Sequence, residues 1–379
     1  MSRSTTVRVA VSLLTLALTA AVARAADPLC PVAIGSWPTW SSGQPDAPPE
    51  GSPVDALAVA AVGDIAVVAD ATHGVGNLRV LDASNPERPT EVGRIDLPSD
   101  PTAVALAPGM AVVGHNLFIV DYCDAGGVST IDLRDPTAPR LLGTSDFPVY
   151  HCINDVAVHD ETVYVLDQND LAVVDIEDPE HPVQVSSTMF GPDWSGLTDL
   201  LIAEGRLWAV GYGGVMCVAD LAESGRFRDL GCRIKAQDDF VTIDVAGGLA
   251  GAVVDHPPPL GRRLMVLDVG VPDAPWTLSM TPTAGRAAAV SLSGRLAVVS
   301  LGLDGGMEIF DIRTASDPIE LSLHQPVVAD AAGLAVVGDR LWLAARREGV
   351  EIYRLDGCRA PRRPAGRRGD VDPRSVIRH

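Results

Sequence analysis

The chain has 379 residues, of which 47% are hydrophobic and 21% are charged, so it is long enough to bury a sizeable core. Its net charge is −20, and the acidic residues are concentrated in the middle of the chain. Residues 1–25 carry three arginines, and residues 359–379 carry seven arginines against two aspartates. An acidic body of this kind repels phosphate backbones, which argues against nucleic acid as a partner.

The N-terminal segment has the features of a secretory signal peptide. A basic start is followed by an apolar run over residues 9–22 and by a small-x-small cleavage site from Ala23 to Ala25. The run is shorter than the roughly 20 apolar residues that a membrane span needs. We therefore expect residues 1–25 to be removed, leaving a periplasmic, secreted or cell-surface protein without a transmembrane anchor.

One sequence phrase recurs along the rest of the chain. It consists of an apolar run, an aspartate and a turn that contains proline, as in LRVLDASNPERP from Leu78 and LAVVDIEDPEHP from Leu171. The copies follow one another at intervals of 43 to 50 residues, the spacing of a four-stranded propeller blade. The equivalent positions are Asp82, Asp132, Asp175, Asp220, Asp268, Asp311 and Arg354.

Each complete copy predicts four antiparallel strands. A hairpin such as DVAVHDETVYVLD from Asp155 precedes the phrase, and a further strand such as RLLGTSDFP from Arg140 follows the turn. The sequence therefore predicts an all-β, seven-bladed β-propeller over residues 26–358, with a disordered basic tail over residues 359–379. The expected blades lie near residues 54–98, 101–148, 152–190, 196–234, 239–282, 285–326 and 327–358.

The D-x-x-x-P-x-x-P turn after each apolar strand resembles the LVIVD repeat, which occurs in bacterial propellers that are often exported. The resemblance extends from Cys30 to Cys358 and implies the fold rather than a function. The copies depart from it at residues 222–225, where AESG replaces the proline turn, and at Arg354. Because aspartate accepts hydrogen bonds from backbone N–H groups just ahead and proline cannot extend the strand, we interpret the repeated aspartates as structural.

The last copy ends at Cys358 without the outer strand that the complete copies have after the turn. The segment PVAIGSW, residues 31–37, precedes the first blade and matches PTEVGRI, residues 89–95. We expect residues 31–37 to complete the last blade, because pairing the two chain ends removes an unpaired strand edge and closes the ring.

The chain has six cysteines, an even number that predicts three disulfides in an oxidising compartment. The number alone allows 15 pairings, but the blade register narrows them. No C-x-x-C pair or Cys/His cluster with zinc spacing competes with this interpretation. The expected pairs are Cys217 with Cys232, Cys123 with Cys152 and Cys30 with Cys358.

Candidate functional residues are sought at the propeller face where first strands begin and second strands end. Acidic residues, a few histidines and an aromatic side chain are expected there. Solvated loop ends, a binding surface for an extracytoplasmic protein or glycan, and a catalytic or cation site all remain open. The candidate binding residues are Asp70, His73, Asp121, His151, Asp155, Trp194, Asp199, Asp239, Asp255 and His256.

The sequence contains no G-x-S-x-G elbow, no H-E-x-x-H motif and no glycine-rich phosphate loop, so we predict no catalytic residues. No cofactor or metal centre is predicted either, although adjacent acids such as Asp238 and Asp239 would favour calcium if they held a cation.

We expect a monomeric propeller that serves as a protein- or ligand-binding module. The alternatives are a propeller hydrolase, a quinone-type oxidoreductase or a cation-binding protein that uses the acidic loop face. Strongly perturbed carboxyl or histidine groups in one deep pocket at the central tunnel would favour an enzyme, whereas a broad shallow face would favour a binding module.

Overall fold

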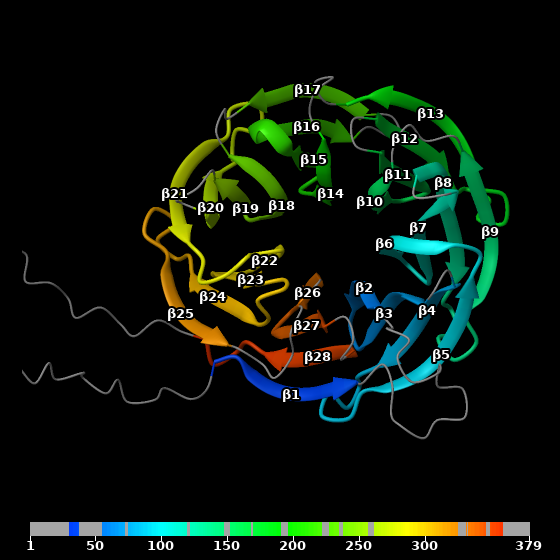
Figure 1. Ribbon diagram of the computed structural model, residues 1–379, viewed down its shortest axis with the longest axis horizontal. Coiled ribbons are helices and arrows are strands. Elements are labelled where there is room, and N and C mark those ends of the chain that lie inside the picture. Colours follow the sequence, from blue (N-terminus) through cyan, green and yellow to red (C-terminus); the bar gives the residue numbers. More distant parts are fainter. Residues whose placement is uncertain are drawn as a thin grey trace, which may run out of the picture.

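A computed structural model describes residues 30–358 except for residues 38–54, 73–74, 120–121, 148–151, 168–169, 191–195, 222–226, 235–237, 257–260, 325–330, 332 and 346–348. Within the described residues, seven four-stranded antiparallel sheets form a ring (Figure 1). The prediction of an all-β, seven-bladed propeller is therefore confirmed. The signal peptide and the basic tail fall outside the described residues and stay predictions.

Six blades are built from four consecutive strands each, and the first strand of each blade lies nearest the axis of the ring. The first blade contains β2 (Asp55–Val62), β3 (Ile65–Thr72), β4 (Val75–Asp82) and β5 (Thr90–Leu97). The second contains β6 (Asp100–Ala107), β7 (Met110–Ile119), β8 (Tyr122–Asp132) and β9 (Arg140–Phe147). The third contains β10 (Ile153–His159), β11 (Thr162–Asp167), β12 (Asp170–Asp175) and β13 (Val183–Met189).

The remaining blades follow the same order, with a short 3-10 helix, η1 (Tyr212–Gly214), inside the fourth. The fourth blade contains β14 (Leu197–Ala203), β15 (Arg206–Gly211), β16 (Val215–Leu221) and β17 (Phe227–Ile234). The fifth contains β18 (Asp239–Ala246), β19 (Leu249–His256), β20 (Gly261–Asp268) and β21 (Trp276–Pro282). The sixth contains β22 (Ala289–Ser293), β23 (Leu296–Ser300), β24 (Met307–Asp311) and β25 (Ile319–His324). The seventh contains β26 (Gly333–Val337), β27 (Arg340–Ala345), β28 (Gly349–Arg354) and, as its outer strand, β1 (Val32–Trp37).

The core lies between the blades. Successive side chains of a strand point to opposite faces of the sheet. Along β11, Val163 and Val165 join the apolar cluster toward the second blade, while Tyr164 and Leu166 join the cluster toward the fourth blade. Both faces of a blade are thus covered, which explains why the middle strands are continuous apolar runs. None of the described residues belongs to a helix long and apolar enough to cross a membrane.

The repeated aspartate holds the turn between the third and outer strands. Asp82 Oδ1 accepts the backbone N–H of Ser84 at 2.7 Å, and Asp175 Oδ1 accepts that of Glu177 at 2.8 Å. The same bond recurs at Asp132, Asp268 and Asp311. These contacts confirm the predicted hydrogen bonds from backbone groups just ahead.

A glycine in three of the outer strands lets the neighbouring blade approach. A Cβ atom on Gly93 of β5 would lie 2.3 Å from the carbonyl oxygen of Pro136 in the turn of the second blade. A Cβ atom on Gly35 of β1 would lie 1.8 Å from the carbonyl oxygen of Pro86 in the turn of the first blade. The glycine shared by PVAIGSW and PTEVGRI therefore has a packing reason, because each proline turn rests on the outer strand of the preceding blade.

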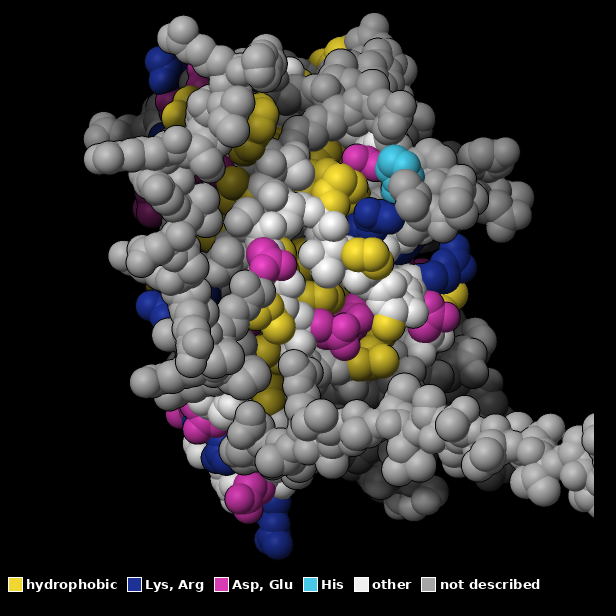
Figure 2. Space-filling view, turned by 90° about the vertical axis from the view of Figure 1, so that its left-hand side faces the viewer, with side chains coloured by type: hydrophobic (Ala, Val, Ile, Leu, Met, Phe, Trp, Pro, Cys, Tyr) yellow, Lys and Arg dark blue, Asp and Glu magenta, His cyan; other side chains and the backbone are white. Residues whose placement is uncertain are grey.

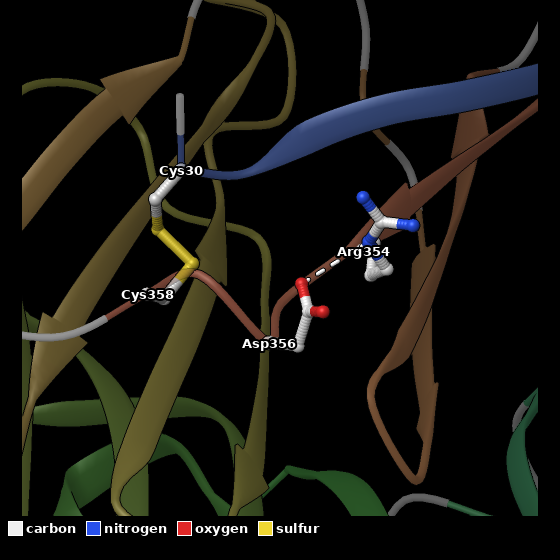
Figure 3. Close-up of a disulfide and its surroundings, with 4 residues drawn as sticks. All are labelled: Cys30, Arg354, Asp356 and Cys358. Atoms are coloured by element: carbon white, nitrogen blue, oxygen red, sulfur yellow. Dashed lines mark hydrogen bonds and ion pairs between the residues drawn. A yellow bond between two sulfur atoms is a disulfide. The ribbon is translucent and has the colours of Figure 1, made fainter. Parts of the chain in front are cut away.

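The ring closes through β1 and β28, as the sequence predicted. The two strands are antiparallel, with Val32 opposite Arg354 and Trp37 opposite Val350. Cys30 and Cys358 form a disulfide beyond these strands, with 5.0 Å between their Cα atoms (Figure 3). In the same turn, Arg354 Nε donates to Asp356 Oδ1 at 3.1 Å.

The other cysteines agree with the expected pairing wherever their side chains are described. Cys217 and Cys232 lie opposite each other on β16 and β17 and form a disulfide. Cys152 is also disulfide-bonded. The side chain of its expected partner, Cys123, lies outside the described part of the structure, so that pairing stays a prediction.

Hydrophobic side chains also reach the outer surface of the ring. Figure 2 shows the side that carries β21 and β25, where such side chains lie among acidic and basic ones. Trp276 at the start of β21 has 72% of its surface exposed, and Val271 in the preceding turn has 59%. Scattered exposed apolar residues are normal for folded proteins and by themselves indicate no partner.

The closing disulfide can be tested against a second disulfide in the same chain. In the chain-entropy model, a loop with a sequence separation of 328 residues stabilises the fold by about 6 kcal/mol, and one with a separation of 15 residues by about 3 kcal/mol. We expect Cys30→Ser to lower the melting temperature more than Cys232→Ser does, and each variant to expose one titratable thiol. If calorimetry shows that the two variants lower the melting temperature equally, the longer loop of the Cys30–Cys358 disulfide gives no extra stability.

Candidate functional site in the central tunnel

The inner strands of the seven blades surround a cavity of about 380 Å³ on the propeller axis. Its wall is polar on one side of the ring, where Asn154, Asp155, Thr198, Asp199, Thr242, Asp244 and Ser291 line it. Small or aliphatic side chains, among them Ala58 and Ala103, line the other side. The lining contains no lysine, arginine or histidine among the residues that the structure describes.

Two of the predicted site residues, Asp155 on β10 and Asp199 on β14, are brought together in this tunnel. Asp155 Oδ2 accepts the backbone N–H of Leu200 in the next blade at 3.0 Å. Asp199 Oδ2 accepts the backbone N–H of Ile243 in the blade after that at 2.7 Å. The two carboxyl groups also lie close enough to influence each other's pKa.

Asp244 on β18 makes the same kind of contact one step further around the ring. Its Oδ2 accepts the backbone N–H of Leu292 at 2.7 Å and the hydroxyl of Ser291 at 3.0 Å. Each of the three aspartates therefore bonds the inner strand of the following blade. Each inner strand is the edge of its sheet, so its N–H groups on the tunnel side would otherwise lack partners. The three carboxyl groups accept such N–H groups and thereby connect the third to sixth blades.

The tunnel environment favours the protonated form of these acids. Burial and the neighbouring Asp199 carboxylate raise the pKa of Asp155 well above its ordinary value. Burial likewise raises the pKa of Asp199 and of Asp244. A carboxyl pair that shares one proton can act as a hydrogen-bond donor and acceptor at once, which is the chemistry needed to bind hydroxyl groups or to catalyse acid/base steps.

The remaining described candidates lie elsewhere. Asp70 is not on an exposed loop end but fully buried on β3, where it pairs with Arg79 of β4. Asn77 donates to the same carboxylate at 3.2 Å, and the Arg79 guanidinium lies 5.6 Å from the ring centroid of Trp37 on β1. This position gives Asp70 a structural role at the junction where the ring closes.

Asp239, Asp255 and His256 gather at the ends of β18 and β19 in the fifth blade. Asp239 lies opposite Asp255 in the strand register, and its Oδ1 accepts the N–H of Gly213 at 2.6 Å. His256 Nδ1 pairs with the carboxylate of Asp238. This group is separate from the three tunnel aspartates, and no set of three or more His, Cys, Asp or Glu side chains in the described ranges could hold a metal ion.

Four candidates, His73, Asp121, His151 and Trp194, lie outside the described residues. Sequence reasoning missed Asp244, Thr198 and Thr242 as tunnel residues. Asp155 and Asp199 stand one residue before an apolar pair in equivalent inner strands, whereas Asp244 is two positions further along its own strand. Because of this offset of two residues, the repeat alignment does not place Asp244 with Asp155 and Asp199.

Together, the fold and the cavity define a seven-bladed β-propeller with a ligand-sized axial tunnel. A family model described as "LVIVD repeat" matches residues 54–97 and 153–189. The chain is therefore a seven-bladed β-propeller that contains LVIVD repeats in its first and third blades. No curated protein matches it.

Solved structures resemble the chain in fold. The periplasmic gluconolactonase of Pseudomonas aeruginosa has 14% identity and a TM-score of 0.61, covering 79% of this chain and 88% of that one. The Pan2 WD40 domain of Neurospora crassa has 12% identity and a TM-score of 0.61, covering 86% and 95%. BamB of Moraxella catarrhalis has 14% identity and a TM-score of 0.52, covering 80% and 84%. At these identities the likeness shows the propeller fold alone.

The role of the tunnel aspartates in joining blades can be measured directly. Replacing Asp244 by Ala removes the acceptor of the Leu292 N–H and the Ser291 hydroxyl, and we expect a loss of about 2 kcal/mol in the free energy of unfolding. Glu177→Ala, at an exposed carboxylate, should cost less than about 0.5 kcal/mol. Equal denaturant midpoints for the two variants would show that the carboxyl group of Asp244 does not hold the blades.

Proposed function

We propose that this chain is an exported binding module that takes a small, uncharged, hydroxyl-rich ligand, such as a monosaccharide unit of a glycan, into its central tunnel. The observation that carries this proposal is the cavity of about 380 Å³ with carboxyl, hydroxyl and amide groups on one wall. Pockets for small ligands begin at roughly 300 Å³, so the volume suits one small molecule.

The charge of the tunnel supports the choice of ligand. Three carboxyl groups and the absence of a cationic side chain among its described lining residues disfavour anions such as sugar phosphates. Thr198, Thr242 and Ser291 alternate with the carboxyl groups along the wall. Such mixed donors and acceptors match the paired hydroxyl groups of a sugar better than a single charge.

The disulfides support placing this module outside the cytoplasm. The Cys30–Cys358 and Cys217–Cys232 bridges need an oxidising compartment to persist. The N-terminal sequence predicts export to the same side of the membrane. A periplasmic or secreted module of this kind would meet free sugars and glycans directly.

The site can be tested by filling it. Ala58 lines the tunnel on the side opposite the three aspartates and also packs against the core between the first and second blades. Ala58→Phe should therefore narrow the cavity without removing a hydrogen bond, provided that its melting temperature shows an intact fold. With calorimetry we expect glucose to bind the wild-type protein, gluconate to bind at least tenfold more weakly, and the Ala58→Phe variant to lose binding. Val62→Phe, at a residue that is 60% exposed, serves as the matched control. Unchanged glucose binding by Ala58→Phe would place the ligand elsewhere.

A propeller hydrolase is the second candidate, because the raised pKa values of Asp155 and Asp199 in the tunnel are the feature that favours an enzyme. We place it second because the same carboxyl groups have a structural use, each accepting a backbone N–H of the next blade. In ester or lactone hydrolysis, the ionised carboxyl would take a proton from the attacking water while the protonated one gives its proton to the leaving oxygen. The site thus contains both the acid and the base that such a reaction needs.

Turnover distinguishes the two candidates. If the tunnel hydrolyses glucono-δ-lactone above the uncatalysed rate, we expect Asp199→Asn to lower that rate by about a hundredfold or more, since one member of an acid/base pair is lost. Asp239→Asn, outside the tunnel, should leave the rate unchanged. Binding of the sugar without any turnover would leave the binding module as the function.

A further inference from the structure

One position of the repeat faces the preceding blade throughout the ring. It lies on the third strand, three residues before the repeated aspartate or arginine, and it is buried in six blades and half-buried in the seventh. Its occupants are Arg79, Ser129, Ala172, Cys217, Met265, Glu308 and Glu351. Because the seven positions are equivalent in the backbone, the partners of their side chains can be compared directly.

In the blades other than the sixth, the charged and polar groups at this position have partners. The guanidinium of Arg79 pairs with Asp70 and, at 3.1 Å, with Glu91. Glu351 accepts a hydrogen bond from the hydroxyl group of Tyr353. A buried charge without such compensation costs several kcal/mol, so compensation is the expected state.

Glu308 on β24 is the exception. Its side chain is 1% exposed, and Oε1 accepts the backbone N–H of Ala284 at 2.9 Å. The other oxygen, Oε2, is buried and has no hydrogen-bond partner. The residue therefore holds the connection between the fifth and sixth blades with one oxygen and leaves the second uncompensated.

The charged groups on the surrounding segments do not neutralise it. Asp304 on the 301–306 turn and Glu320 on β25 are acidic, and Asp304 accepts the N–H of Arg286 at 2.6 Å. Arg262 on β20 is engaged by Asp255 and by the carbonyl oxygen of Ala287. Burial, reinforced by the negative charge of Glu320, raises the pKa of Glu308 to about 7.

The connection that Glu308 holds leads straight into the tunnel wall. Residues 283–288 run from the fifth blade to β22, whose Ala289, Val290 and Ser291 line the cavity. Ser291 also donates its hydroxyl to Asp244. Any loosening of this connection therefore reaches the polar wall of the tunnel.

We propose that Glu308 is a proton-operated latch, in which the protonated side chain fastens the 283–288 connection to the sixth blade and deprotonation releases it. With Oε1 bonded to the Ala284 N–H, the proton resides on Oε2. Loss of the proton leaves a negative charge among apolar residues of the interface, and that charge reaches water only when the connection opens. The latch stands on its own geometry, whereas its effect on the ligand rests on the proposed function of the tunnel.

The sign of the pH dependence follows from the raised pKa. The closed form binds its proton up to about pH 7, while the opened form, with an exposed glutamate, loses it near pH 4.5. Opening is therefore least favourable below pH 4.5. It becomes easier by up to tenfold per pH unit toward pH 7 and levels off above pH 7.

Hydrogen exchange of the full-length protein tests the latch. After correction for the intrinsic exchange rate, we expect protection of the Ala284 amide to fall by about fortyfold between pH 5 and pH 7 in the wild-type chain. Glu308→Gln keeps an acceptor oxygen for the Ala284 N–H but cannot ionise, so its protection should not change with pH. Glu320→Gln, which alters only a neighbouring charge, should keep most of the wild-type dependence.

An identical pH profile in the wild-type and Glu308→Gln chains would overturn the proposal. If Glu308→Gln fails to fold, Glu308→Met, which copies the Met265 position of the fifth blade, should give a melting temperature that falls less between pH 5 and pH 8 than the wild-type value does. Glucose titrations at pH 5 and pH 8 separate the two proposals. If protection of the Ala284 amide depends on pH as expected but the protein binds no glucose, the latch is supported and the proposed function is wrong.

Discussion

The pairing of β1 with β28 is the constraint on which the rest of this structure depends. A blade buries both faces only if it has a neighbour on each side, so an open ring would expose the first and last blades. The closing strand also carries Trp37 to the guanidinium of Arg79, whose charge is balanced by the buried Asp70. Pairing, packing and charge compensation therefore meet at one junction, which the Cys30–Cys358 bridge lies beside.

The unpaired edges of the outer and inner strands are covered in different ways. At the rim, outer strands receive the proline turn of the following blade over a glycine such as Gly93. At the axis, backbone N–H groups of the inner strands face the tunnel, and Asp155, Asp199 and Asp244 accept three of them. The polar wall of the tunnel thus results from a structural need, and the same carboxyl groups supply the donors and acceptors that a ligand would use.

Perturbed carboxyl groups in this ring fall into two kinds. In the tunnel, burial and the neighbouring Asp199 carboxylate raise the pKa of Asp155, and burial raises the pKa of Asp199. At the blade interface, Glu308 Oε2 has no hydrogen-bond partner. Only protonation therefore removes the free-energy cost of a buried negative charge there. The tunnel pair belongs to the site, whereas Glu308 controls how firmly one wall of that site is held.

The sequence by itself determined the blade count, the closing strand and the role of the repeated aspartates. These features depend on spacing, on strand alternation and on hydrogen bonds to residues only two positions ahead, all of which are local. The sequence did not reveal that Asp155 points into a tunnel, that Asp70 is buried against Arg79, or that Asp244 belongs with Asp199. Those outcomes depend on contacts between blades more than 40 residues apart, and a shift of two positions along one inner strand is invisible until the ring is assembled. Only the tertiary structure decides which acids face water and which face one another, because burial and neighbouring charge are properties of the closed ring.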